Sequence, residues 1–109
     1  MLAWSAAMAM QASLKATIEC AAAFATTDFR PDLAAFNVPT LIVHGTADKT
    51  VPIDATARQA AAQIPGSRLI EYEGAPHGLF ASHKTRLATD VIRFLDQATE
   101  APKARTAAQ

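Results

Sequence analysis

The sequence predicts an α/β fold with two parallel strands and a helix between them. Thr40 to Val43 is short, apolar and rich in β-branched residues, which is typical of a strand buried on both faces. Arg68 to Tyr72 has the pattern of a second strand, and Asp54 to Ile64 has that of a helix. Because a strand–helix–strand unit of this length closes as a right-handed crossover, the strands are expected to be parallel.

A pair of helices is expected before the first strand, at Leu2 to Gln11 and Ser13 to Phe24. Ser13 is a suitable N-cap for the second helix, whose apolar residues recur at helical spacing. Pro31 can open a short helical turn over Asp32 to Phe36.

A last helix is expected after the second strand, from Ser82 or His83 to Gln97. It carries one apolar stripe that would pack on the sheet, formed by Leu87, Val91, Phe94 and Leu95. Residues 98–109 lack an apolar period and are expected to be a disordered tail. The core then spans residues 28–97, and residues 1–27 precede it.

Charge and cysteine content exclude several classes of function. Ten basic and ten acidic residues balance, so no net field attracts nucleic acid or an anionic membrane. No apolar run approaches the roughly 20 residues of a membrane span, and the first ten residues lack the basic start of a signal peptide. The single cysteine, Cys20, fits a reducing, cytoplasmic compartment and is expected to be a small buried residue.

Asp48 and His77 are the candidate catalytic residues. Each lies in a glycine-containing loop that follows a predicted strand, in Leu41-Ile-Val-His-Gly-Thr-Ala-Asp48 and in Gly74-Ala-Pro-His-Gly78. Parallel strands end at the same edge of a sheet, and open α/β sheets place their chemistry at that edge. An acid beside a histidine is the orienting half of a nucleophilic triad.

The nucleophile that such a pair would serve is absent from the sequence. None of the four serines, Ser5, Ser13, Ser67 and Ser82, has the flanking glycines of a Gly-x-Ser-x-Gly elbow. The chain is therefore expected to be the C-terminal part of an enzyme whose first half is not present.

Three segments resemble the C-terminal part of α/β hydrolases of the cofactor-free haloperoxidase, or perhydrolase and esterase, branch. They are Phe29-Arg-Pro-Asp-Leu33, Val38-Pro-Thr-Leu-Ile-Val-His-Gly-Thr-Ala-Asp-Lys-Thr-Val-Pro-Ile53 and Ile70-Glu-Tyr-Glu-Gly-Ala-Pro-His-Gly-Leu-Phe80. The resemblance implies that residues 1–27 are the end of a helical cap and residues 28–97 the end of the hydrolase core. It also matches Asp48 to the acid and His77 to the histidine of a Ser-Asp-His triad.

The activity that the resemblance implies is acyl transfer from a small ester or carboxylic acid. Water as acceptor gives hydrolysis, and hydrogen peroxide gives a peracid that oxidises halide, so no haem, metal or other cofactor is needed. Without the serine and the loop of the oxyanion hole, the isolated chain is expected to be inactive.

The other histidines have less specific patterns. His44 at a strand end is expected to be structural, and His83 is expected to begin the last helix and face solvent. The three histidines lack metal-ligand spacing. Six apolar residues could line an acyl pocket, although core packing is the default for an apolar helix face: Trp4, Met8, Met10, Phe24, Leu79 and Phe80.

Two alternatives to a serine-type hydrolase stay open. An epoxide hydrolase or dehalogenase would have an aspartate as nucleophile in the absent part. A non-catalytic fragment would pair with itself or with a separate first half. Because the strand Thr40 to Val43 has only one partner strand in this chain, self-association through its free edge is expected.

Overall fold

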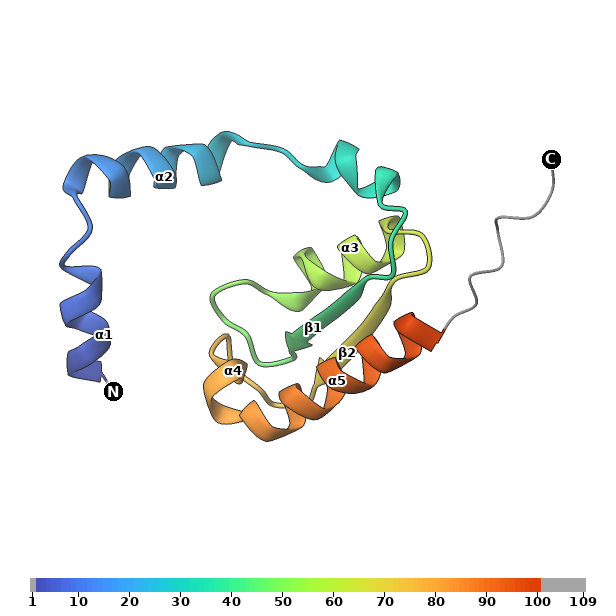
Figure 1. Cartoon of the computed structure of the whole chain (residues 1–109). Coiled ribbons are helices and arrows are strands. Elements are labelled where there is room, and N and C mark those ends of the chain that lie inside the picture. The colour runs from blue at the N-terminus through green and yellow to red at the C-terminus, as the bar shows by residue number, and fades with distance from the viewer. Residues whose placement is uncertain (1, 101–109) are drawn as a thin grey trace. The chain divides into compact units, whose positions relative to one another are not determined.

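The computed structural model describes residues 2–100, which divide between Pro31 and Asp32 into two compact units. The helical unit contains α1 (Leu2–Ala9) and α2 (Leu14–Thr26). The sheet unit contains both strands and the remaining α-helices (Figure 1). A 3₁₀ helix, Arg30–Ala35, lies where the two units join, close to the predicted turn.

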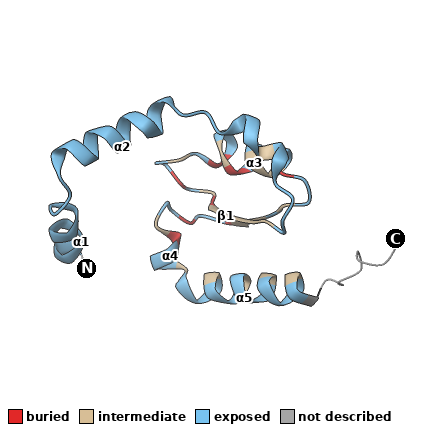
Figure 2. Cartoon of the chain, turned by 45° about the horizontal axis from the view of Figure 1, so that its top comes forward, coloured by how far each residue is buried: buried red, intermediate tan, exposed pale blue. Residues whose placement is uncertain are grey.

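Both predicted helices of the helical unit form, but α1 ends two residues before Gln11 and α2 continues two residues past Phe24. The Ser13 side chain accepts a hydrogen bond of 3.1 Å from the Ala16 amide, which confirms Ser13 as the N-cap of α2. Cys20 is exposed, so the expectation of a buried residue was wrong. Neither α1 nor α2 contains a buried residue (Figure 2).

The sheet consists of β1 (Leu41–Gly45) and β2 (Arg68–Tyr72), which are parallel as predicted. The register pairs Leu41 with Arg68 and Gly45 with Tyr72. β1 extends two residues beyond its predicted end at Val43, since His44 and Gly45 still have partners on β2.

The helix predicted at Asp54 to Ile64 is divided in two. A 3₁₀ helix, Ile53–Ala55, precedes α3 (Ala57–Gln63), and Thr56 between them has φ −131° and ψ −86°, outside the helical region. The Thr56 hydroxyl donates to the Pro52 carbonyl at 2.8 Å, and this local bond accompanies the break.

Two helices follow β2, where one was predicted. The short α4 (Leu79–Ser82) precedes α5 (Lys84–Glu100), and His83 separates them with φ −123°. α5 therefore continues three residues past the predicted end at Gln97, and the rest of the predicted tail, residues 101–109, lies outside the described residues. No helix within residues 2–100 is both long enough and apolar enough to span a membrane.

The core of the sheet unit centres on Tyr72, at the end of β2. Tyr72 and Ala75 are fully buried, and Leu79 is nearly so. Val43, Ile70 and Leu87 pack against them. Leu87 is therefore the part of the predicted α5 stripe that reaches this core, whereas Leu95 is 54% exposed.

Polar contacts of Tyr72 attach α5 to the sheet. Its hydroxyl donates to the Asp90 carboxylate at 2.6 Å, and the Arg86 guanidinium lies 3.8 Å from its ring centre. The His83 ring meets Tyr72 edge to face with centroids 5.7 Å apart. His83 is half-buried by this contact, so the prediction that it faces solvent was wrong.

Candidate active site

The candidate site lies where both strands end. The acid loop (residues 46–52) follows β1, and the histidine loop (residues 73–78) follows β2. Because Gly45 pairs with Tyr72, the two loops begin at the same level of the sheet. Parallel strands thus deliver both loops to one edge, as the sequence predicts.

Three hydrogen bonds hold the two loops together. The Thr46 amide donates to the Tyr72 carbonyl at 3.0 Å, and the Thr46 hydroxyl accepts from the Gly74 amide at 2.8 Å. The Ala47 amide donates to the Ala75 carbonyl at 3.1 Å. These bonds fix the backbone that carries Asp48 relative to the backbone that carries His77.

Two glycines make this approach possible for different reasons. Gly74 has φ +68°, a left-handed conformation that side chains with a Cβ rarely adopt. A Cβ atom on Gly45 would overlap the Ala75 carbonyl oxygen and lie 2.7 Å from its carbonyl carbon. Gly45 therefore allows the histidine loop to cross directly over the end of β1.

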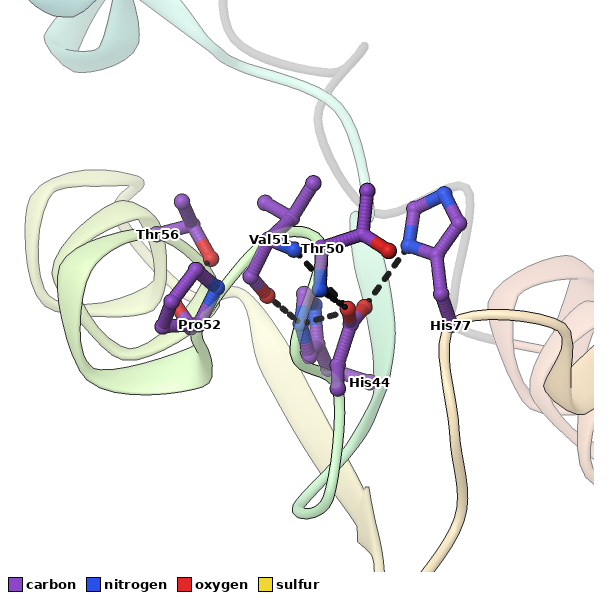
Figure 3. Close-up of polar contacts among 7 residues, drawn as sticks. His44, Thr50, Val51, Pro52, Thr56 and His77 are labelled. Atoms are coloured by element: carbon purple, nitrogen blue, oxygen red, sulfur yellow. Dashed lines mark hydrogen bonds and ion pairs between the residues drawn. The ribbon is translucent and has the colours of Figure 1, made fainter.

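The Asp48 carboxylate is buried and receives hydrogen bonds on both oxygens. Oδ1 accepts from the amides of Thr50 and Val51 at 2.9 and 2.8 Å. Oδ2 lies 2.8 Å from His77 Nδ1, and the Asp48 side chain is only 4% exposed. Figure 3 shows these bonds converging on the carboxylate from the loop and from His77.

The environment of Asp48 favours its ionised form. Burial raises the pKa of this carboxyl, but the hydrogen bonds from the Val51 amide, the His77 side chain and the Thr50 amide outweigh burial. The pKa of Asp48 therefore lies below its ordinary value. A carboxylate beside a histidine can then stabilise positive charge on the imidazole.

His77 presents the opposite edge of its ring to solvent. Because a carboxylate oxygen only accepts, the bond to Oδ2 requires the proton on Nδ1. This leaves a lone pair on Nε2 in the neutral ring, and the side chain is 56% exposed. No residue described in the structure hydrogen-bonds to Nε2, which Figure 3 shows on the side of the ring away from the dashed bond. The neutral imidazole can therefore accept a proton at Nε2.

His44 contacts the same carboxylate, which was not expected from the sequence. Its Nε2 lies 3.3 Å from Asp48 Oδ2 and 2.8 Å from the Val51 carbonyl oxygen. The one sequence feature that could have indicated this contact is the spacing of four residues between His44 at the strand end and Asp48 in the loop. That spacing alone does not show whether the chain between them folds back.

A hollow of about 310 Å³ adjoins the pair. Apolar side chains form much of its lining, which consists of Val43, His44, Gly45, Asp48, Val51, His77, Leu79, Phe80 and Leu87. Leu79 and Phe80 thus do lie beside His77, although Leu79 also belongs to the core.

Both serines of the sheet unit have partners other than His77. Ser67 donates to the Ala61 carbonyl at 3.1 Å, and Ser82 Oγ lies 2.8 Å from His83 Nδ1. Within residues 2–100, no group of three or more histidine, cysteine, aspartate or glutamate residues could hold a metal ion. The described chemistry is therefore an acid–histidine pair with an open imidazole nitrogen.

The sequence pattern of the α/β hydrolase fold family matches residues 9–84. The chain belongs to this family. The fold class and the family resemblance inferred from the sequence are thereby confirmed.

Similar proteins of the family include haloperoxidases and esterases. The chain is 42% identical over 92 residues to the non-heme chloroperoxidase CPO-A1 of Kitasatospora aureofaciens, covering 83% of this chain and 34% of that protein. It is 33% identical over 86 residues to the bifunctional esterase/perhydrolase DCH of Acinetobacter calcoaceticus, covering 79% and 31% respectively. The chain thus spans about a third of the length of each of these two relatives.

Solved structures show the same relationship in three dimensions. A bromoperoxidase from Bacillus anthracis superimposes with a TM-score of 0.77 at 43% identity, over 81% of this chain and 32% of that one. An esterase from Exiguobacterium antarcticum gives a TM-score of 0.79 at 30% identity, over 85% and 34%.

Proposed function

We propose that Asp48 and His77 are the acid and the base of a Ser-Asp-His triad in an esterase or cofactor-free haloperoxidase–perhydrolase. The observation that supports this most directly is the 2.8 Å contact between Asp48 Oδ2 and His77 Nδ1, with Nε2 of His77 open. The nucleophilic serine and the oxyanion donors would come from protein outside these 109 residues, beyond the third of the relatives that the chain spans.

Each residue has a defined role in the proposed reaction. His77 Nε2 takes the proton of the serine hydroxyl as the oxygen attacks an ester or acid carbonyl, and then gives it to the leaving group. Asp48 holds the Nδ1 proton and stabilises the imidazolium. Water then releases the acyl group as an acid, or hydrogen peroxide releases it as a peracid.

The names of the relatives and the composition support a substrate class and a location. The names of the matched relatives include chloroperoxidase and esterase/perhydrolase, which supports small esters or carboxylic acids as substrates. The apolar hollow beside His77 is consistent with an acyl chain near the base. A cytoplasmic location is part of the same proposal and rests on the single cysteine.

A chimeric enzyme tests the proposal. This chain replaces the matching third of the Kitasatospora chloroperoxidase, and hydrolysis of p-nitrophenyl acetate is measured with halide oxidation in the presence of peroxide. We expect activity in the chimera and a loss of roughly 10⁴-fold or more in kcat for His77→Ala.

His83→Ala is the matched control, because His83 belongs to the same unit but contacts Tyr72 and Ser82. It should keep the activity of the chimera. A folded chimera whose activity is unchanged by His77→Ala would show that this histidine is not the base.

A further inference from the structure

We propose that His44 is a positioning residue that holds the Asp48 carboxylate in the orientation His77 requires. This inference rests on the proposed function, because orienting Asp48 matters for catalysis only if Asp48 and His77 belong to a triad. It goes beyond that function by giving the second histidine of the site a role of its own.

The contacts of His44 are short and protected from solvent. Nε2 lies 2.8 Å from the Val51 carbonyl oxygen and 3.3 Å from Asp48 Oδ2. The His44 side chain is 15% exposed and that of Asp48 is 4% exposed. Water therefore has little access to compete with His44 for the Asp48 carboxylate.

Elementary hydrogen-bond chemistry fixes the proton on this nitrogen. A carbonyl oxygen only accepts, so His44 Nε2 must donate to Val51. The same N–H then faces Asp48 Oδ2, which cannot donate when ionised. In the neutral ring, His44 thus carries its proton on Nε2, whereas His77 carries its proton on Nδ1.

The carboxylate is consequently surrounded by four N–H groups. The amides of Thr50 and Val51 face Oδ1, and the two imidazoles face Oδ2. A carboxylate offers about four lone-pair sites, so the set leaves little freedom to rotate about the Cβ–Cγ bond. Without His44, the Val51 carbonyl also loses its donor, and the turn that supplies the two amides is less firmly held.

The position of His44 on β1 allows it to reach both Asp48 and Val51. His44 pairs with Glu71 in the register, one residue before Gly45, so it has a fixed backbone position beneath the acid loop. After Gly45 the chain makes a turn, in which the Asp48 amide donates a hydrogen bond of 3.2 Å to the Gly45 carbonyl. This turn brings Asp48 and Val51 back to the side chain of His44. Figure 3 shows the His44 ring between Val51 and the carboxylate.

Nitrogen-15 NMR of the 109-residue chain tests the proposal, because protonated and bare ring nitrogens have distinct shifts. In the parent we expect His77 protonated on Nδ1 and His44 on Nε2. His44→Phe keeps an aromatic ring but removes the donor, and it should lower the Nδ1–H fraction of neutral His77 at least twofold. His44→Gln supplies an amide N–H in place of Nε2–H and should restore the parent state, and His83→Phe should leave it unchanged.

A folded His44→Phe chain with the parent tautomer at His77 overturns the proposal. If His44→Phe does not fold, the parent decides: a bare Nε2 on His44 overturns the proposal, since no donor would then face Oδ2, and a protonated Nε2 supports it. The readout needs no catalysis. An inactive chimera with a His44-dependent tautomer would therefore refute the proposed function alone, and an active chimera with a His44-independent tautomer would refute this inference alone.

Discussion

The Cα atom of Gly45 faces the carbonyl group of Ala75 so closely that a methyl group at position 45 would overlap the carbonyl oxygen. This approach lets the histidine loop pass over the end of β1, and the Ala47 amide then donates to the same carbonyl. The distance between Asp48 and His77 thus depends on a residue that has no functional group.

Gly45→Ala is expected to destabilise the sheet unit by about 1–3 kcal/mol, because the Ala75 backbone must move to admit the methyl group. Urea unfolding followed by circular dichroism measures the loss. Gly78→Ala is the control, since Gly78 has φ −80° and nothing lies within 4 Å of the place that a methyl group would occupy there. Equal midpoints for the two variants would contradict the close approach.

Stability at acid pH should depend on Asp48. Because the pKa of folded Asp48 lies below that of the unfolded residue, about 3.9, its carboxylate stabilises the fold above that pH. This contribution disappears as the pH falls through the folded pKa. Asp48→Asn should therefore show a shallower decline in stability than the parent as the pH falls below about 4.

Asp96→Asn is the control for acid unfolding, because the Asp96 side chain is exposed and has no hydrogen bond within residues 2–100. Urea midpoints at a series of pH values give the comparison. If Asp48→Asn and the parent lose stability in parallel, the carboxylate contacts do not favour the ionised form.

Tyr72→Phe removes the 2.6 Å hydrogen bond to Asp90, whose side chain is only 13% exposed. We expect a loss of about 1–2 kcal/mol in the free energy of unfolding, since Asp90 keeps only its longer contacts with Arg86 and Arg93. A double-mutant cycle with Asp90→Asn isolates the pair. A coupling energy near zero would mean that other contacts attach α5 to the sheet.

The isolated chain should not hydrolyse p-nitrophenyl acetate above the buffer rate, because an acid–histidine pair has no nucleophile to activate. His77→Ala and a Ser5→Ala, Ser13→Ala double variant accompany the parent in the assay. Turnover that disappears in the double variant would show that one of these serines is the nucleophile after all.

The free edge of β1 is expected to make the chain associate with itself. Within the described residues β1 pairs only with β2, and Leu41, Ile42 and Val43 offer neither charge nor proline to prevent pairing. Light scattering after size exclusion should show a dimer or larger species, shifted toward monomer by Ile42→Lys. Ala62→Lys, on the exposed part of α3, should not shift it. A compact monomer of the parent chain would exclude association through this edge.

The sequence by itself determined the parts of this protein that depend on local pattern. The apolar run before Asp48 and the apolar residues before Glu73 place both strands, and the bounds Arg68–Tyr72 agree with the structure residue for residue. Adjacent parallel strands end at the same edge of the sheet, so the emergence of Asp48 and His77 at one edge was predictable from the strand–helix–strand order.

Only the tertiary structure decided which side chains meet at that edge. The contact between His44 and Asp48, the break at Thr56 and the burial of His83 against Tyr72 all depend on how the backbone turns after each strand. Periodicity specifies which residues share a face. It does not specify the direction of a side chain in a loop, because that direction follows from the register and from hydrogen bonds between segments distant in sequence.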